Sequence, residues 1–232
     1  MALTNKLSAI GNAIREKTGK TDLLTLDQMP QEIKGIETGG DTEVEDTIVE
    51  RTITGSYTNN RIETVGENAF RGAKISEFNS TSVKTISSFA FYYVATLEEC
   101  NTPNVTNFSG NGAFTNCTNL KKVNFKNNSN GLNTNCFNGC TSLEYANIGN
   151  CSWIASNAFN NCSSLETLII TRTSSVTSIS NTNVFAGSGI ANGTGFVYVA
   201  DNLYEEYLTA TNWSTYASQI KKISELPEGV EL

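Results

Sequence analysis

Histidine is absent from this 232-residue chain, and its absence restricts the chemistry that the protein can perform. Ser-His-Asp catalysis, Cys-His catalysis and histidine-ligated metal sites all require an imidazole, so the sequence excludes them. Basic residues are also scarce, because 16 Lys and Arg stand against 23 Asp and Glu, for a formal net charge of −7. A surface that binds a nucleic-acid duplex needs clustered cations, so we expect no nucleic-acid partner.

Long apolar runs are missing too, and with them several functional classes. No stretch reaches the roughly 18 apolar residues of a membrane-spanning helix, so we expect no membrane insertion. The first residues, MALTNKL, lack the apolar segment of a secretory signal, so we expect no signal peptide in this chain. No phosphate-binding loop of the type G-x-x-x-x-G-K-[ST] occurs. We therefore predict no enzyme, cofactor, metal or catalytic residue, with a two-carboxylate carbohydrate-active enzyme as an alternative.

Small polar residues are abundant instead: 29 Asn, 29 Thr and 22 Ser make up about a third of the chain. Only 17% of the residues are charged and 9% are aromatic, which is unlike a disordered segment. The apolar residues are therefore expected to be concentrated at regular positions.

A repeat confirms that regularity, because six phenylalanines recur at spacings of 21 to 26 residues. They are Phe70, Phe91, Phe114, Phe137, Phe159 and Phe185. Three residues after each comes a small residue, and about six residues after comes Leu or Ile. The segment that follows, L-x-x-φ-x-φ at residues 143–148 for example, alternates like a half-buried strand. One such unit cannot bury its own apolar face, so the units are expected to stack.

The repeating unit I-x-x-I-x-x-x-A-F-x-x-C-x-x-L-x-x-φ-x-φ resembles the BspA-type leucine-rich repeats of bacterial surface proteins. The likeness is clearest at residues 114–125, 137–148 and 159–170. It implies an α+β fold, a β-rich solenoid of about six coils with small helical N- and C-terminal caps. It also implies a non-catalytic recognition or adhesion protein, although a repeat scaffold predicts fold better than function.

The six repeated phenylalanines and three cysteines are the predicted structural core. Cys117, Cys140 and Cys162 share one repeat position and should form a column of buried thiols that act as small hydrophobes. A disulfide between adjacent coils is the alternative. The sequence contains no histidine and no C-x2-C pair, and both absences oppose a zinc site.

Four parts are predicted along the chain: a helical leader or docking module at 1–38, an acidic linker at 39–47, the solenoid at 48–200 and a C-terminal cap at 201–232. The leader carries one helical apolar stripe, formed by Leu3, Leu7, Ile10 and Ile14. A stripe of this kind fits either a cap that seals the solenoid or a docking or oligomerisation module.

The amino-acid sequence of the leader shows a second resemblance. The sequence AIREKTG at residues 13–19, followed by LTLDQMP at 24–30, resembles tail-associated and minor structural proteins of phages and prophages of Gram-positive bacteria. This resemblance implies docking on a larger assembly through residues 1–36, and a place in a virion tail or at the bacterial cell surface.

At the C-terminal end, residues 196–199 are expected to form the last strand. Asp201 is expected to be the N-cap of a helix, and a further turn or helix should begin at Ser214.

The candidate binding surface consists of the solvent-facing positions of the repeat strands. Side chains of neighbouring strands lie about 4.8 Å apart there, and polar residues with one aromatic suit a protein or cell-surface glycan partner. The predicted binding residues are Glu98, Asn101, Lys121, Lys122, Asn124, Glu144, Tyr145, Asn147, Glu166 and Thr167, with Glu99 and Ile169 on the same strands. A solvated face without a ligand, in a purely structural virion or surface-array subunit, is the alternative.

Overall fold

The structure is a computed structural model, and it describes residues 53–230 and residue 232. The chain divides into two compact units, residues 1–42 and residues 43–232, and all the described residues belong to the second. The predicted leader and acidic linker lie outside the described residues, as do the first five residues of the predicted solenoid.

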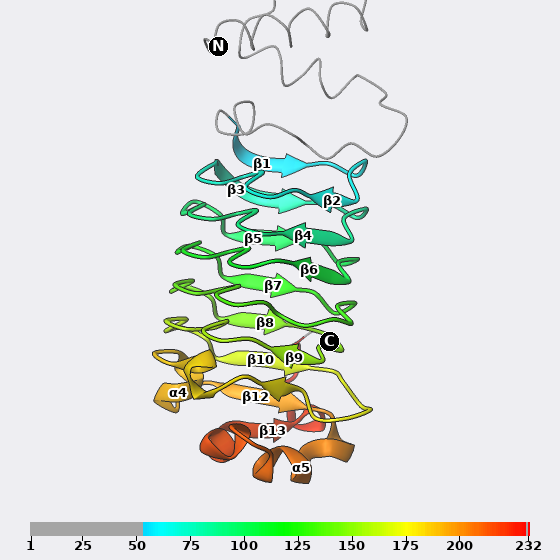
Figure 1. Ribbon diagram of the computed structural model, residues 1–232, viewed down its shortest axis with the longest axis vertical. Coiled ribbons are helices and arrows are strands. Elements are labelled where there is room, and N and C mark those ends of the chain that lie inside the picture. Colours follow the sequence, from blue (N-terminus) through cyan, green and yellow to red (C-terminus); the bar gives the residue numbers. More distant parts are fainter. Residues whose placement is uncertain (1–52, 231) are drawn as a thin grey trace, which may run out of the picture. The chain divides into compact units, whose positions relative to one another are not determined.

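The described residues wind into a β-rich solenoid whose main sheet has eight strands, all paired in parallel (Figure 1). In spatial order the strands are β1 (Thr54–Thr58), β3 (Lys74–Asn79), β5 (Glu99–Asn101), β7 (Lys122–Asn124), β8 (Tyr145–Asn147), β10 (Thr167–Ile170), β12 (Phe196–Val199) and β13 (Ile220–Lys222). Parallel neighbours require the chain to return after every strand, and each coil of the solenoid is one such return.

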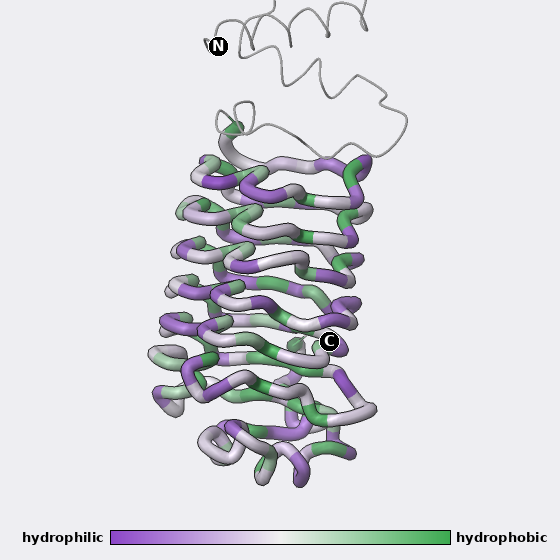
Figure 2. The backbone as a smooth tube through the Cα atoms, in the orientation of Figure 1, coloured by the Kyte–Doolittle hydropathy of each residue, from purple (hydrophilic) through white to green (hydrophobic). Residues whose placement is uncertain are grey.

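Two smaller parallel sheets form on the return path. One contains β2 (Thr64–Val65), β4 (Thr85–Ser87) and β6 (Asn107–Ser109), and the other pairs β9 (Trp153–Ile154) with β11 (Ser178–Ile179). Two apolar residues three positions apart precede most of the repeated phenylalanines, and the second of the two lies in one of these strands, as Ile86 does in β4. Hydrophobic and hydrophilic segments therefore alternate at similar places in successive coils (Figure 2).

Short helices occur only towards the C-terminus of the described residues. They are η1 (Thr182–Phe185), α4 (Gly189–Asn192), η2 (Asp201–Leu203), α5 (Tyr204–Thr209), η3 (Trp213–Gln219) and η4 (Ile223–Glu225). The predicted strand at residues 196–199 is confirmed as β12, but it is not the last strand, because β13 pairs with it.

One detail of this end was predicted wrongly, and another was predicted to within one residue. Asp201 is not an N-cap but the first residue of η2, and its Oδ1 accepts a hydrogen bond from the backbone N–H of Ser224 at 3.1 Å. The Asp201 carboxylate thus bonds to a residue 23 positions away in the sequence instead of capping its own helix. The helix expected from Ser214 begins one residue earlier, at Trp213, and is a 3-10 helix.

The repeated phenylalanines form one continuous stack through the interior. Centroids of adjacent rings are 4.9 to 5.8 Å apart and the ring planes differ by 5° to 15°. None of the six exposes more than 1% of its surface. The backbone holds the register, because the N–H of Phe91, for example, donates to the carbonyl oxygen of Ala113 in the next coil at 2.7 Å. Stacked rings add a specific contribution to the burial of their apolar area.

A column of thiols runs beside the stack. Cys117, Cys140 and Cys162 are fully buried, and all six cysteines are free. Each thiol of this column donates to the carbonyl oxygen of a stacked phenylalanine in the preceding coil; Cys140 Sγ lies 3.1 Å from the oxygen of Phe114. Burial raises the pKa of Cys140 to about 12 and also raises the pKa of the other two thiols.

The stack ends at Phe185, whose ring packs against aromatic side chains of the C-terminal helices. The rings of Trp213 and Tyr216 lie 5.7 and 5.2 Å from that of Phe185, and Tyr207 packs on Trp213 at 5.2 Å. Their polar atoms are paired: Trp213 Nε1 donates to the carbonyl oxygen of Thr177 at 2.6 Å, and the Tyr207 hydroxyl accepts from the Thr177 N–H at 2.9 Å. The last ring of the stack is therefore covered without leaving these polar atoms unsatisfied.

Replacing Phe137 by alanine is expected to lower the free energy of unfolding by roughly 3–5 kcal/mol, as for other large buried aromatics. The ring lies between those of Phe114 and Phe159, and the backbone ladder keeps the neighbouring coils from closing the cavity. Urea unfolding followed by circular dichroism measures the change. Glu99→Ala, at an exposed position of β5, is the control and should change stability by less than about 0.5 kcal/mol. An unchanged midpoint for the Phe137 variant would contradict the stack as the core.

The thiols should be reduced and unreactive in the native protein, because a buried thiol with a raised pKa forms little thiolate. Alkylation near pH 8 followed by mass spectrometry should leave Cys117, Cys140 and Cys162 unlabelled until denaturant is added. Rapid native labelling of all three, or a disulfide between any two, would contradict the buried column.

Candidate binding surface

In-register pairing arranges the outward side chains of the main sheet into columns. The first column contains Ser56, Glu77, Glu99, Lys122, Tyr145, Thr167 and Phe196. Successive members lie about one strand spacing apart, near 4.8 Å, because the strands are parallel and paired residue to residue. The middle of this column places an acid, a base and an aromatic ring side by side, in Glu99, Lys122 and Tyr145.

A second, more charged column lies one residue before the first. It contains Glu98, Lys121, Glu144 and Glu166, which are exposed and aligned by backbone hydrogen bonds between coils. Lys121 Nζ lies 2.8 Å from Glu98 Oε2, and this hydrogen bond, with the nearby charges of Glu98 and Glu144, raises the pKa of Lys121. An exposed pair of this kind adds little stability, but it fixes a pattern of charge that a partner can complement.

Three lysines of the main sheet lie over aromatic rings, and one of them is Lys222, whose Nζ is 5.1 Å from the ring centroid of Tyr204 in α5. Lys122 Nζ is 5.2 Å from the ring centroid of Tyr145, and Lys221 Nζ is 3.5 Å from that of Phe196. Such cation–π contacts hold a flexible lysine in one place, so less side-chain entropy is lost when a partner binds.

A third column is made of asparagines on the same outer face. Asn101 Nδ2 donates to Asn79 Oδ1 at 2.8 Å, and Asn79 Nδ2 donates to Ser56 Oγ at 3.2 Å. Asn124 departs from this pattern of side-chain bonds between strands, because its Oδ1 accepts a hydrogen bond from the backbone N–H of Lys126 in a local turn. Asn101 and Asn124 therefore face solvent with part of their amide groups already paired.

Asn147 belongs to the same column, but the prediction that it faces solvent is wrong because it is fully buried. Its neighbours on the next two strands, Ile169 and Tyr198, are larger; they are also buried, yet they lie outside the main apolar cluster. Ile169 was likewise expected to be solvent-facing. Burial raises the pKa of the Tyr198 phenol, and the nearby charge of Glu225 in η4 raises it further. Helix η4 thus lies near the Tyr198 end of this face, and the open part of the column ends at Asn124.

The other predicted binding residues remain accessible. Glu98, Asn101, Lys121, Lys122, Glu144 and Glu166 are exposed, and Asn124, Tyr145 and Thr167 are half-buried. The structure therefore brings nine of the ten predicted residues together on the outer face of strands β5 to β10 and the residues just before them.

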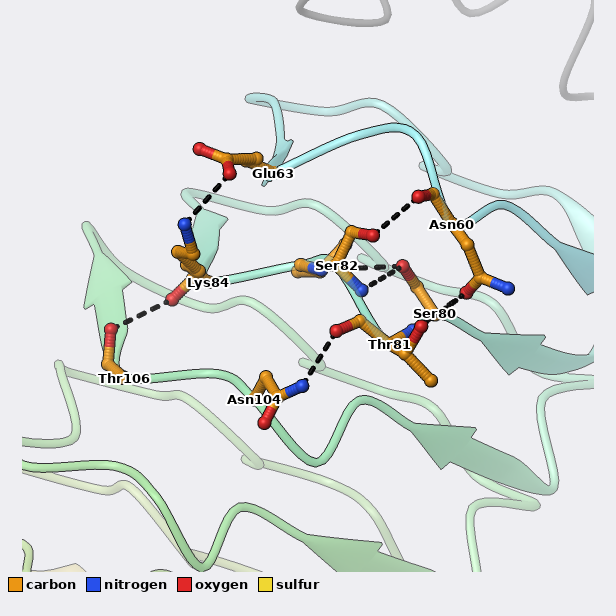
Figure 3. A network of polar contacts seen from close by, with 9 residues as sticks. Asn60, Glu63, Ser80, Thr81, Ser82, Lys84, Asn104 and Thr106 are labelled. Atoms are coloured by element: carbon orange, nitrogen blue, oxygen red, sulfur yellow. Dashed lines mark hydrogen bonds and ion pairs between the residues drawn. The ribbon is translucent and has the colours of Figure 1, made fainter.

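Polar side chains also join the coils at bends of the main sheet, as at those that follow β1, β3 and β5 (Figure 3). Asn60 Oδ1 accepts from the backbone N–H of Thr81 at 2.8 Å, and Asn104 Nδ2 donates to the Thr81 carbonyl oxygen at 2.7 Å. Nearby, Lys84 Nζ lies 2.8 Å from Glu63 Oε1. Much of the abundant Asn and Thr therefore satisfies the backbone at the bends, so we do not include the bends in the binding surface.

Three aromatic residues of functional interest were missed by the sequence analysis: Phe89, Tyr92 and Tyr93. Phe89 and Tyr93 have φ of 54° and 58°, a left-handed conformation that costs a non-glycine residue about 1–2 kcal/mol. The sequence did hold a signal, since equivalent positions of other coils carry Asn or Gly.

In the part of the chain that the structure describes, no group of three or more His, Cys, Asp or Glu residues could hold a metal ion. No helix of these same residues is long and apolar enough to cross a membrane.

Stacked coils with a parallel main sheet and few helices define the chain as a β-rich repeat solenoid of the leucine-rich type. The sequence matches the family described as BspA type leucine rich repeat region in six copies, over residues 63–191. This match covers more than half of the chain, so the protein belongs to that family. No curated protein matches the sequence. Members of the family are commonly surface adhesion or protein-binding proteins and are generally non-catalytic.

Proposed function

We propose that this protein is a non-catalytic recognition protein that presents the outer face of its main sheet to a protein or glycan at a cell surface. The main support for this proposal is the row formed by Glu99, Lys122 and Tyr145 on adjacent strands. The charged column that contains Lys121 flanks this row. This face is built on hydrogen-bonded parallel strands and is largely polar, and it displays charges of both signs around the ring of Tyr145. Partners recognise such a surface by complementary charge and by contact with the ring.

The same face gives little support to catalysis. Glycoside hydrolysis requires two carboxyl groups across the scissile bond, one of them with a raised pKa in a sheltered site. The carboxylates of this face, including Glu98, Glu144 and Glu166, are exposed to solvent. The carbohydrate-active enzyme is therefore the less supported alternative.

The two ends of the chain complete the proposal. Residues 201–232 act as a C-terminal cap, supported by the contacts of Trp213 and Tyr216 with Phe185 at the end of the stack. Solenoids need such a terminal unit because the last coil would otherwise expose its apolar interior. The resemblance of the leader supports attachment to a larger assembly through residues 1–36, in a virion tail or at a bacterial cell surface. A purely structural subunit of that assembly is the alternative function.

Replacing Lys122 and Tyr145 together by alanine should weaken binding of the full chain to Gram-positive cells about tenfold or more, because the ring and the charge over it are lost together. Binding of fluorescently labelled protein to intact cells, protease-treated cells and purified wall glycan measures the effect and separates a protein partner from a glycan. Lys126→Ala, which removes an exposed lysine at the bend after β7, is the matched control and should bind normally. No binding by the folded wild-type chain would favour the structural alternative, and turnover of the glycan would overturn the non-catalytic proposal.

Deleting residues 1–40 should abolish incorporation into the larger assembly while the remaining chain keeps its circular dichroism spectrum and its cell binding. The expected result follows from the separation of an attachment segment from the binding solenoid. Co-purification with assembled particles is the measurement, and normal incorporation of the shortened chain would contradict a docking role for the leader.

A further inference from the structure

A cluster of aromatic side chains lies on the turn between β4 and β5. The backbone of this turn is at the left edge of the ribbon in Figure 1. It contains Phe89, Tyr92 and Tyr93, together with Arg71 from the preceding coil; we call these four residues the turn cluster. The ring centroid of Tyr92 lies 5.4 Å from that of Phe89 and 4.6 Å from that of Tyr93, and Arg71 Cζ lies 4.8 Å from the Tyr92 centroid. The turn cluster is separate from the outer face of the main sheet, because its rings come from the turn before β5.

The backbone of this turn departs from the rule that the other coils follow. The position of Phe89 is occupied in neighbouring coils by Asn68, Gly112, Asn135 and Asn157, and all of them have positive φ. The position of Tyr93 is occupied by Gly72, Asn116, Gly139, Asn161 and Gly187, again with positive φ. Asparagine and glycine tolerate this conformation, whereas bulky aromatic residues are strained in it. Two strained aromatics in one turn therefore indicate a role other than folding.

The turn cluster is both exposed and preorganised. Tyr93 is 53% exposed, and among the described residues the only other large hydrophobic residue so exposed is Leu232 at the C-terminal end. The Phe89 ring lies against Gly112 of the next coil, where a Cβ atom would stand only 2.7 Å from the ring. Since the rings are fixed by each other and by the neighbouring coil, a partner that binds them immobilises few additional side chains.

The guanidinium of Arg71 is linked to a carboxylate through an intervening side-chain amide rather than by a direct ion pair. The exposed Arg71 donates from Nη1 to Asn68 Oδ1 at 3.3 Å, and Asn68 Nδ2 in turn donates to Glu67 Oε1 at 3.4 Å. Within the described part of the chain, no carboxylate forms an ion pair with Arg71. A guanidinium stacked on a ring keeps donors at its edge that match a carboxylate.

We propose that the turn cluster is a second binding site, which takes a segment of a partner protein carrying a carboxylate next to an apolar side chain. The carboxylate pairs with Arg71, and the apolar side chain packs on the exposed ring of Tyr93. Tyrosine and arginine are the residue types that dominate binding energy in protein interfaces. The geometry disfavours a glycan, because the ring planes of Phe89 and Tyr92 differ by 82° and those of Tyr92 and Tyr93 by 70°, so no shared flat platform exists for successive sugars.

A library of random linear twelve-residue peptides displayed on phage, selected on the immobilised full chain, tests the proposal. Phage that also bind the double variant Phe89→Asn/Tyr93→Asn are removed at each round. This variant carries the asparagines that other coils use at these positions, so it should fold and unfold at an equal or higher temperature. The surviving peptides should place Asp or Glu beside an aliphatic or aromatic residue.

A synthetic peptide of the selected consensus, titrated by isothermal calorimetry, then identifies the contacts. Its affinity should fall about tenfold or more for the double variant and for Arg71→Ala, and Arg71→Lys should not restore it, since lysine lacks the planar group. The Lys122→Ala/Tyr145→Ala variant and Lys126→Ala should bind it normally, so failure of the main-sheet proposal leaves this result unaffected. Recovery of no peptide that depends on the turn cluster, a consensus without a carboxylate, or loss of purified wall-glycan binding in the double variant would each overturn the proposal.

Discussion

The stacking of one phenylalanine on the next is the interaction on which the rest of this structure depends. Each ring fills the interior of its own coil and completes that of its neighbours, and the flanking backbone ladder sets the spacing between them. That spacing places the strands of the main sheet in register and fixes the outward columns. The candidate surface of Lys122 and Tyr145 is thus a consequence of a core that lies on the other side of the same strands. Its chemistry is free to vary because none of its side chains takes part in the stack.

Much of the fold follows from the sequence because its strongest signal, the phenylalanine register, is also its strongest physical constraint. The register predicted the buried positions of Phe114 and Phe137, and the alternation after Leu120, Leu143 and Leu165 predicted β7, β8 and β10 of the main sheet. The smaller sheets were not predictable in this way, because each of their strands contains a single buried residue and so shows no pair of alternating apolar positions. Likewise β13 could not be anticipated, since Ile220 follows a helical segment outside the repeat.

The candidate surface was predictable only as far as local alternation determines it. Alternation placed Lys122 and Glu99 outward correctly, but it could not reveal that Asn147 is covered. Asn147 is followed in its column by Ile169 and Tyr198 of later strands, which are larger and also buried, and the alternation within one strand carries no information about them. The turn cluster was missed for the opposite reason. A bulky residue among Asn and Gly becomes informative only when the left-handed conformation of those positions is known.

The backbone ladder between coils also determines how the solenoid responds to force. Its hydrogen bonds run from one coil to the next, so they point along the direction in which the coils are stacked. A pull along that direction would load these bonds along their length, and because each coil contacts chiefly its neighbours, the coils would separate one after another from an end. Such a chain would lengthen in steps of about one coil, roughly 22 residues, and would dissipate energy at each step rather than rupture at once.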